Sequence, residues 1–455
     1  MEYTQVLLFI YLALLLSVVF VKRLKSNTEL DFTLSNRNLG LFPFVATIVA
    51  TAYGWILAVG ELYYIDGITA WVYLSLPYML GFIVFGLLLA KKARATNNVT
   101  ISDLLKSTYN NKVATFGTLF FLVYLFPAMY ILMSAQLLQS ILGIGIEWCL
   151  LIATLFSMIY VLTGGFKAVV FTDVIQFIIM FGGFAAASIY LFNNFGDVTV
   201  SKELISTHLE FNISGSWVYI LSWFLLATIT LVDPAVYQRV YAVKSPRVAV
   251  TGIFLAIACW LVFDAMEATT GIFTRILLPD IPNVAVAYPE LAAQILPANL
   301  SAVFVLGMLA VIMSTTDSFL FLSALTLAKD VLKPNRIFSE VSTQKLTQYN
   351  LVIVSAICFI ITLIYRHSSV VELFFDFVPV TVSVLLLPIL SAYYPKLTLK
   401  SGQVLAQMLI SFVICISYQI VKPSLGAGFE EINPVYFGLG TALTLQLIFS
   451  LINRK

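Results

Sequence analysis

The stretch Ala302–Ala324 reads AVFVLGMLAVIMSTTDSFLFLSA and decides the fold. Its apolar residues cover the length of about 20 residues that a helix needs to cross a bilayer. Hydroxyl residues and an aspartate interrupt this run at Ser314–Ser318. A carboxylate at the bilayer centre costs at least ~2.5–3.5 kcal/mol on insertion scales, so such a residue usually has a function. The stretch therefore predicts a transmembrane helix with a polar, functional face.

The composition of the whole chain extends this prediction to further helices. Of 455 residues, 60% are hydrophobic and 11% are charged, whereas soluble domains carry roughly 25% charged residues. A soluble core of this size cannot bury so much apolar surface, so the excess must face lipid or other buried helices. We expect an all-α integral membrane protein of about thirteen transmembrane helices, near 4–21, 41–62, 68–90, 114–142, 147–163, 168–193, 216–237, 248–275, 299–328, 347–365, 370–394, 401–421 and 433–452.

Basic residues test this division of the chain. Most of the 25 Lys and Arg residues fall in alternate loops between the predicted spans, as the positive-inside rule requires. This sorting predicts a multi-pass protein of the cell inner or plasma membrane, with its N-terminus outside and its C-terminus in the cytoplasm. The net charge of +2 indicates no nucleic-acid partner. The lipid bilayer is the expected partner, and no obligate protein partner is evident.

Acidic residues fall within the predicted spans, and no Lys or Arg is expected at a comparable depth. An unpaired carboxylate in low dielectric must be protonated or bind a cation. The acidic residues within the predicted spans therefore indicate a path for cations through the protein. The acidic residues concerned are Asp173, Asp233, Asp264, Glu267, Asp317, Glu372 and Asp376, and the sequence assigns no role to Asp233, Asp264, Glu267, Glu372 or Asp376.

Two clusters carry the most specific signal. On a helix, Ser314, Asp317 and Ser318 share one face, with Thr315 adjacent, and their oxygens suit a hard cation such as Na⁺. The alternative is that the hydroxyls bond their own helix and permit close packing. In the second cluster, Thr163–Gln176 (TGGFKAVVFTDVIQ), two glycines end one span and Asp173 lies in the first turns of the next. Capping and cation binding are both open for Asp173.

These two clusters resemble the hallmark motifs of the sodium/solute symporter family, which includes proline, pantothenate, sialic acid and sodium/glucose cotransporters. Tyr237–Ser245 (YQRVYAVKS), Gly271–Pro279 and Ser35–Gly40 (SNRNLG) also match. The resemblance implies a LeuT-type core of two inverted five-helix repeats with discontinuous helices, broken near Ala52–Trp55 and Ala227–Pro234. It implies a single transmembrane domain over residues 1–455, with an extra helix at 4–21, the core at about 41–394 and two C-terminal helices within 401–452.

The resemblance also implies the ligands. Its main sodium site maps to backbone oxygens of Val49, Ala52 and Val311 with the hydroxyls of Ser314 and Thr315. A second sodium, held by some members, maps to Asp173, Ser314, Asp317 and Ser318; Asp317 departs from the pattern because a serine can occur there. The solute pocket beside the helix breaks maps to Thr51, Tyr53, Trp55, Gln136 and Trp223.

The function expected from these residues is sodium-coupled import of a small organic solute by alternating access. Members of the family that carry anionic solutes can use an arginine on the fourth span; none occurs there in this sequence, so the resemblance argues against a simple carboxylate and leaves neutral, zwitterionic or cationic solutes. One alternative is a proton-coupled transporter of the same fold, with Asp173 or Asp317 titrating. Another is a membrane sensor, although no output domain follows the last helix. An enzyme is not expected, because no nucleophile with a base is evident.

Overall fold

The computed structural model describes residues 2–21, 28–196, 216–366, 370–426, 429 and 431–454. These segments form helices joined by short loops, and they contain no strand beyond an isolated bridge between Leu39 and Val243. The helices are α1 (Glu2–Val21), α2 (Glu29–Leu34), α3 (Leu41–Ala52), α4 (Ile56–Asp66), α5 (Thr69–Tyr73), α6 (Ser75–Leu88), α7 (Ala90–Ala95), α8 (Ile101–Thr108), α9 (Asn111–Leu125), α10 (Ala128–Leu142), α11 (Ile146–Phe195), α13 (Trp217–Leu226), α14 (Pro234–Ala242), α15 (Pro246–Leu277), α16 (Ala287–Gln294), α17 (Ala298–Thr326), α18 (Thr343–Ile364), α19 (Val370–Ala392), α20 (Ser401–Val421) and α21 (Val435–Arg454).

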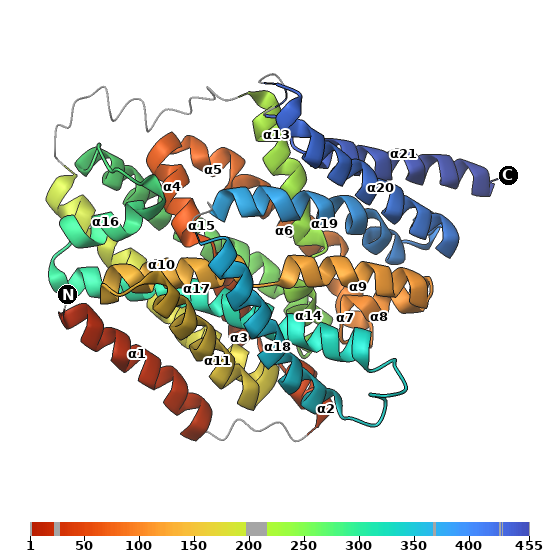
Figure 1. Ribbon diagram of the computed structural model, residues 1–455, viewed down its shortest axis with the longest axis horizontal. Coiled ribbons are helices and arrows are strands. Elements are labelled where there is room, and N and C mark those ends of the chain that lie inside the picture. Colours follow the sequence, from red (N-terminus) through yellow and green to blue (C-terminus); the bar gives the residue numbers. More distant parts are fainter. Residues whose placement is uncertain are drawn as a thin grey trace.

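The helices form a bundle of membrane-spanning length. Among the described residues, ten helices are long and apolar enough to cross a membrane, and there are eleven if the bent pair α3–α4 is one span. Two shorter apolar segments, Tyr3–Ser17 and Ile146–Ile159, correspond to the first and fifth predicted spans. The all-helical membrane architecture is confirmed, whereas the count of thirteen stays a prediction. In Figure 1, α1 lies at one edge of the bundle, and α20 and α21 lie at the opposite edge.

The fifth and sixth predicted spans follow each other without an intervening loop, in α11. Gly165 separates them with φ 57° and ψ −148°, a conformation that glycine adopts readily because it has no Cβ. Phe32 of α2 packs against this glycine, and a Cβ added there would meet the Phe32 ring at 2.5 Å. The sequence placed a break here correctly, and the close contact with α2 explains why glycine is needed.

Helix α17, which carries the motif, lies in the centre of the bundle and packs against α1, α3, α10, α11 and α18 (Figure 1). Around Gly183, its contact with α11 is a close approach of the two backbones. A Cβ added to Gly183 of α11 would lie 2.7 Å from the carbonyl oxygen of Val303 and 3.3 Å from the Cα of Gly307. Small residues permit this approach, in which van der Waals packing holds membrane helices together.

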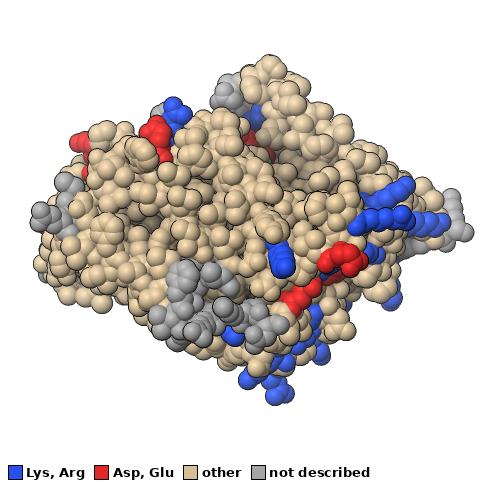
Figure 2. Space-filling model, turned by 60° about the horizontal axis from the view of Figure 1, so that its bottom comes forward, with Lys and Arg blue, Asp and Glu red and all other residues tan. Residues whose placement is uncertain are grey.

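Charged side chains lie at the margins of the bundle. Figure 2 shows Lys and Arg gathered along the lower and right-hand edges of one face, while the broad surface above them is almost free of charge. Exposed large apolar residues, such as Phe9, Ile178, Leu261 and Leu447, belong to helices of this bundle. An uncharged, apolar outer surface is what a lipid environment requires.

Candidate functional site

The site begins at a break between α3 and α4. The two helices are bent by 62° relative to each other, and residues 53–55 between them lie outside both helices. At Gly54 a Cβ would meet the Thr315 side chain at 2.4 Å, so only glycine lets α17 come this close. The break predicted at Ala52–Trp55 is confirmed. A broken helix leaves carbonyl oxygens without helical partners, and these oxygens are available to a ligand.

The motif on α17 faces this break. The Thr315 hydroxyl lies 2.8 Å from the carbonyl oxygen of Thr51 and 3.3 Å from that of Val311. The Ser314 hydroxyl donates to Asp173 at 2.6 Å. Both hydroxyl residues are buried, as are Val49 and Val311. Ala52 is exposed to the cavities described below. Of the residues assigned to the main sodium site, Val311, Ser314 and Thr315 therefore lie on the buried part of α17 that contacts Thr51 near the end of α3.

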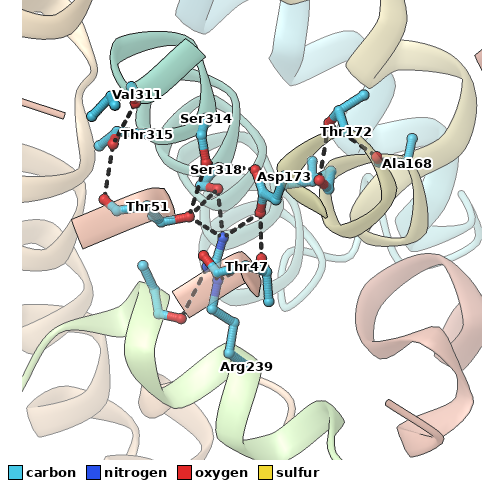
Figure 3. A network of polar contacts seen from close by, with 12 residues as sticks. Thr47, Thr51, Ala168, Thr172, Asp173, Arg239, Val311, Ser314, Thr315 and Ser318 are labelled. Atoms are coloured by element: carbon cyan, nitrogen blue, oxygen red, sulfur yellow. Dashed lines mark hydrogen bonds and ion pairs between the residues drawn. The ribbon is translucent and has the colours of Figure 1, made fainter. Parts of the chain in front are cut away.

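A guanidinium group lies beside Asp173, contrary to the expectation that no Arg or Lys reaches this depth. Arg239 of α14 is buried, and its Nη2 lies 3.2 Å from the carboxylate of Asp173. The hydroxyl of Thr47 also donates to this carboxylate. Because the seventh predicted span ends at residue 237, Arg239 was expected among the basic residues of the cytoplasmic loop that follows it. The correction has a physical reason, because α14 begins at Pro234 inside the bundle and the long arginine side chain extends along α3 (Figure 3).

The same guanidinium group contacts the residues assigned to a second sodium. Nη2 of Arg239 donates to Ser318 and to Thr51, each at 2.6 Å. Asp317, also assigned to that site, is buried on α17, but neither of its carboxylate oxygens accepts a hydrogen bond from the described residues. In the described structure, Asp173 and Ser318 are thus joined by a positive side chain of the protein, and Asp317 takes no part in this network (Figure 3).

A cavity opens beside the break. It is lined mainly by aromatic rings together with one acidic residue, Asp233, and with the Arg239 that pairs with Asp173. Asp233 caps α14 by accepting a hydrogen bond from the N–H of Ala235 at 2.7 Å, and it accepts another from the hydroxyl of Tyr124 at 3.0 Å. The aromatic residues are Trp55, Tyr78, Phe82, Tyr124, Tyr130, Phe319 and Phe374.

The predicted solute residues divide between this cavity and other places. Thr51 and Trp55 line it, and Tyr53 lines a second cavity that adjoins it. Trp223 and Gln136 line neither of these two cavities. Trp223 is fully buried behind Trp55, with the ring centroids 6.0 Å apart, and it supports the cavity wall. Gln136 lies farther along α10, the helix whose residues Met129 and Tyr130 line the first cavity.

The other acidic residues also differ in their surroundings. Asp264 is buried and accepts hydrogen bonds from Tyr53 and, at 3.1 Å, from the indole N–H of Trp71. Asp376 lies within α19, is exposed at the surface of the bundle and accepts a hydrogen bond from Gln419 at 2.8 Å. The side chain of Glu372 lies outside the described residues. Burial in a predicted span therefore did not by itself identify a cation ligand.

The second predicted break lies between α13 and α14. Helix α13 ends at Leu226, residues Ala227–Leu231 form a 3₁₀ turn, and α14 starts at Pro234. The backbone of Leu39, just before α3, pairs with Ala242 and Lys244 at the end of α14, with N···O distances of 3.0 and 3.1 Å. These contacts hold the two interrupted segments side by side, as the LeuT-type arrangement requires.

The family model of the sodium:solute symporter family matches residues 32–410. The chain belongs to the sodium:solute symporter family. The symporter is 26% identical to the sodium/pantothenate symporter of Haemophilus influenzae over 69% of its own length and 68% of that protein. It is 26% identical to high-affinity choline transporter 1 of Drosophila melanogaster over 71% of its length and 55% of that protein.

Its fold matches a solved structure over almost the whole chain. A substrate-bound, outward-open state of a Na⁺-coupled sialic acid symporter superimposes with a TM-score of 0.81, covering 99% of this chain and 97% of that one at 15% identity. The LeuT-type fold, the sodium coupling and the transport of a small solute expected from the sequence are confirmed. The relatives are transporters, which agrees with the expectation that the symporter is not an enzyme.

Proposed function

We propose that the symporter holds its coupling sodium at the break of α3–α4, with backbone oxygens of Val49, Ala52 and Val311 and the hydroxyls of Ser314 and Thr315 as ligands. The observation that carries this proposal is the contact of the Thr315 hydroxyl with the carbonyl oxygen of Thr51, 2.8 Å away, at the end of α3. It brings hydroxyl and carbonyl oxygens, which hard cations prefer as ligands, from two helices to one point.

An ion at this point couples two parts of the fold. Sodium entering from outside holds the broken α3–α4 against α17 and thereby forms the wall of the aromatic cavity. Movement of the core then opens the cavity to the cytoplasm, where low sodium lets the ion and the solute leave. The membrane potential contributes ~2.3 kcal/mol per charge per 100 mV to this cycle, which is sufficient to drive uptake against a gradient.

For the solute we propose a small molecule with an ammonium group, cationic or zwitterionic. Aromatic faces attract such a group, and quaternary ammonium ions are recognised by aromatic cages in this way. Asp233 adds a carboxylate to the cavity, and the hydroxyl of Tyr78, on the wall, is buried without a hydrogen-bond partner among the described residues. The named solutes of the relatives, pantothenate and choline, differ in charge, so the support comes from the cavity lining.

Uptake into proteoliposomes tests the sodium site. The variant Ser314→Ala/Thr315→Ala removes both hydroxyls, and we expect the sodium concentration for half-maximal uptake to rise at least tenfold. The matched control is Thr316→Ala, because the Thr316 hydroxyl bonds only the carbonyl of Ile312 in its own helix. Unchanged sodium dependence in the double variant would overturn the site. Uptake driven by a pH gradient without sodium would instead support proton coupling.

A pair of isosteric solutes tests the charge of the ligand. Choline and its uncharged carbon analogue 3,3-dimethyl-1-butanol have the same shape, and we expect only choline-like ammonium compounds to raise the melting temperature of the purified symporter in sodium. The variant Asp233→Asn keeps the helix cap and removes the charge, so we expect it to weaken this stabilisation. Equal stabilisation by the two compounds would contradict an ammonium solute.

We propose that the symporter lies in the inner or plasma membrane of the cell. Its N-terminus lies outside the cell and its C-terminus lies in the cytoplasm. The sorting of Lys and Arg into alternate loops supports this direction. A fusion of green fluorescent protein, which folds in the cytoplasm, at the C-terminus tests it. Fluorescence is expected, and a dark but fully expressed fusion would overturn the orientation.

A further inference from the structure

Glu267 of α15 is buried without a partner on the other flank of the helix break. Its side chain is 0% exposed, and neither carboxylate oxygen accepts a hydrogen bond from the described residues. The carboxylate lines the second cavity, together with Ala52 and Tyr53 of the break. Its backbone, by contrast, is fixed, because the hydroxyl of Tyr288 donates to its carbonyl oxygen at 2.8 Å. The Glu267 carboxylate therefore extends from an anchored backbone into the cavity region without a hydrogen-bond partner among the described residues.

A second carboxylate lies one turn away on the same helix. Asp264 precedes Glu267 by three residues, which places both on one face of α15. Its oxygens are satisfied by the hydroxyl of Tyr53 and the indole of Trp71. Within the described segments, neither carboxylate forms an ion pair with Lys, Arg or His, since the ion pairs found there involve other acidic residues. Two acidic groups thus share a buried site that has no positive side chain.

The cavity beside them is lined chiefly by apolar and aromatic residues, and a small set of oxygen-bearing side chains within it can serve as cation ligands. Besides the Glu267 carboxylate it contains the hydroxyl residues Tyr53 and Ser75 and the residues of the break at Ala52 and Tyr53. Oxygen ligands with a carboxylate suit a hard monovalent ion. An ion there satisfies the Glu267 carboxylate, whereas an unpaired charge buried in low dielectric is strongly unfavourable.

We propose that Glu267, with Asp264 and the cavity oxygens, binds a second sodium ion on the α15 side of the break. The two sites lie on opposite flanks of one segment, because the Thr51 carbonyl contacts Thr315 of α17 while the Tyr53 hydroxyl contacts Asp264 of α15. This second ion contacts the same break as the first, and it stabilises the α3–α4 bend against α15. The site goes beyond the proposed function and uses none of its sodium ligands except the break residue Ala52.

Counting bound ions tests this site directly. Equilibrium binding of ²²Na⁺ to the purified full chain is expected to give two ions per chain for the wild type. It is expected to give one ion for Glu267→Gln, which removes the charge but keeps the shape. The matched control is Glu290→Gln, because Glu290 is hydrogen-bonded to Gln294 at the surface, and this variant is expected to retain both ions. Binding of two sodium ions to Glu267→Gln would overturn the proposal. The proposal would also be overturned if the wild type bound a single sodium ion and the variant Ser314→Ala/Thr315→Ala bound none.

Further variants separate this proposal from its rivals. Glu267→Asp keeps a charge on a shorter side chain, so we expect it to bind the second ion at least tenfold more weakly than the wild type and still more tightly than Glu267→Gln. A sodium count unaffected by Glu267→Gln, with only the pH dependence of uptake changed, would identify a proton site and overturn the metal site. Loss of one ion in Glu267→Gln but none in Ser314→Ala/Thr315→Ala would leave the Glu267 site standing and contradict the proposed function. A cooperative melting curve recorded in the absence of sodium, together with a monodisperse elution profile, establishes that each variant is folded.

Discussion

Asp173 and Glu267 are both buried carboxylates beside the same helix break, and they differ in their partners. Asp173 lies 3.2 Å from the guanidinium of Arg239 and accepts a hydrogen bond from Ser314. Glu267 has neither kind of partner in the described structure. A buried charge is tolerated when it is paired and is costly when it stands alone. The first carboxylate therefore belongs to the framework of the site, whereas the second is open to a ligand.

Removing Arg239 should have the largest effect. The variant Arg239→Met keeps much of the apolar stem and leaves Asp173 buried without its positive partner, so we expect a loss of about 3–5 kcal/mol of stability and no transport. Thermal unfolding of the detergent-purified protein measures the change. Arg247→Met is the control, because Arg247 is exposed at the start of α15, and its melting temperature should stay within 2 °C of the wild type.

Removing the Asp173 charge as well tests whether the unpaired carboxylate causes the loss of stability in Arg239→Met. The double variant Arg239→Met/Asp173→Asn removes both charges, and we expect it to regain part of the stability lost by Arg239→Met alone, because no unpaired charge remains. If the double variant is less stable than Arg239→Met, the Asp173–Arg239 pair does not explain the effect, and the hydroxyl contacts of Arg239 with Thr51 and Ser318 carry it instead.

Neutralising the two carboxylates should give effects of opposite sign. Without sodium, we expect Asp173→Asn to lower stability by about 2 kcal/mol or more, because Arg239 is left buried and unpaired. Glu267→Gln removes a carboxylate without a partner, so its stability in the same buffer should equal or exceed that of the wild type. Melting curves in potassium-free, sodium-free buffer measure both variants. A destabilisation of Glu267→Gln as large as that of Asp173→Asn would remove the contrast between the two residues.

A methyl group at the break should weaken sodium coupling with little effect on the rest of the fold. In Gly54→Ala the added Cβ meets Thr315 at 2.4 Å, and overpacking of this kind costs about 1–3 kcal/mol. Because Thr315 must move, we expect the sodium concentration for half-maximal uptake to rise about tenfold, which corresponds to ~1.4 kcal/mol. Gly182→Ala is the control, since nothing lies within 4 Å of its added Cβ. Equal sodium dependence in both variants would show that the close contact at Gly54 is unimportant.

The smallest effect is expected at Asp103, outside the membrane-spanning helices. Burial acts to raise the pKa of Asp103, but the Lys329 ammonium 2.5 Å away and the backbone N–H groups of Val99 and Thr100 outweigh it, so the pKa is lowered. Its stabilisation is therefore complete above the ordinary aspartate pKa of ~3.9 and is lost as the pH falls through the lowered value. We expect Asp103→Asn to cost about 0.5–1 kcal/mol at pH 7 and nothing at the lowest pH. A difference in melting temperature that does not shrink on acidification would contradict this.

Several features of the fold could be predicted because they depend on short stretches of sequence. The family resemblance implied a broken helix, Gly54 between apolar residues indicated where, and the structure bends the helix by 62° there. The spacing of Ser314 and Ser318 predicted that their hydroxyls share one face of α17, and both lie near the Thr51 hydroxyl, at 3.4 and 3.3 Å. Helical periodicity fixes the angle between residues of one helix, so it assigns faces correctly without knowledge of the neighbours.

Other features depended on which neighbour covers a face, and periodicity does not contain this information. Asp317 shares a face with Ser314 by spacing, but no contact joins it to Asp173. Arg239 follows Asp233–Pro234 by only a few residues, and the sequence placed it in a loop because basic residues usually lie there. The one available signal was Pro234, which favours the first turn of a helix and thus indicated that Arg239 is helical. Its long side chain then reaches a carboxylate contributed by α11.

The backbone contact of Gly183 with α17 has a mechanical consequence for the transport cycle. No side chain separates the two backbones where Gly183 of α11 meets Val303 and Gly307 of α17, and the Phe184 and Phe304 rings pack beside this contact with centroids 4.8 Å apart, so the two helices should move as one rigid unit. The hydroxyls of Ser314 and Thr315 then stay in fixed positions while α3 and α4 approach or withdraw. Spin labels on α11 and α17 should keep a constant separation with and without sodium, while labels on α4 and α17 should change theirs. A changing separation between α11 and α17 would exclude this rigid unit, and the freedom of motion would lie elsewhere in the bundle.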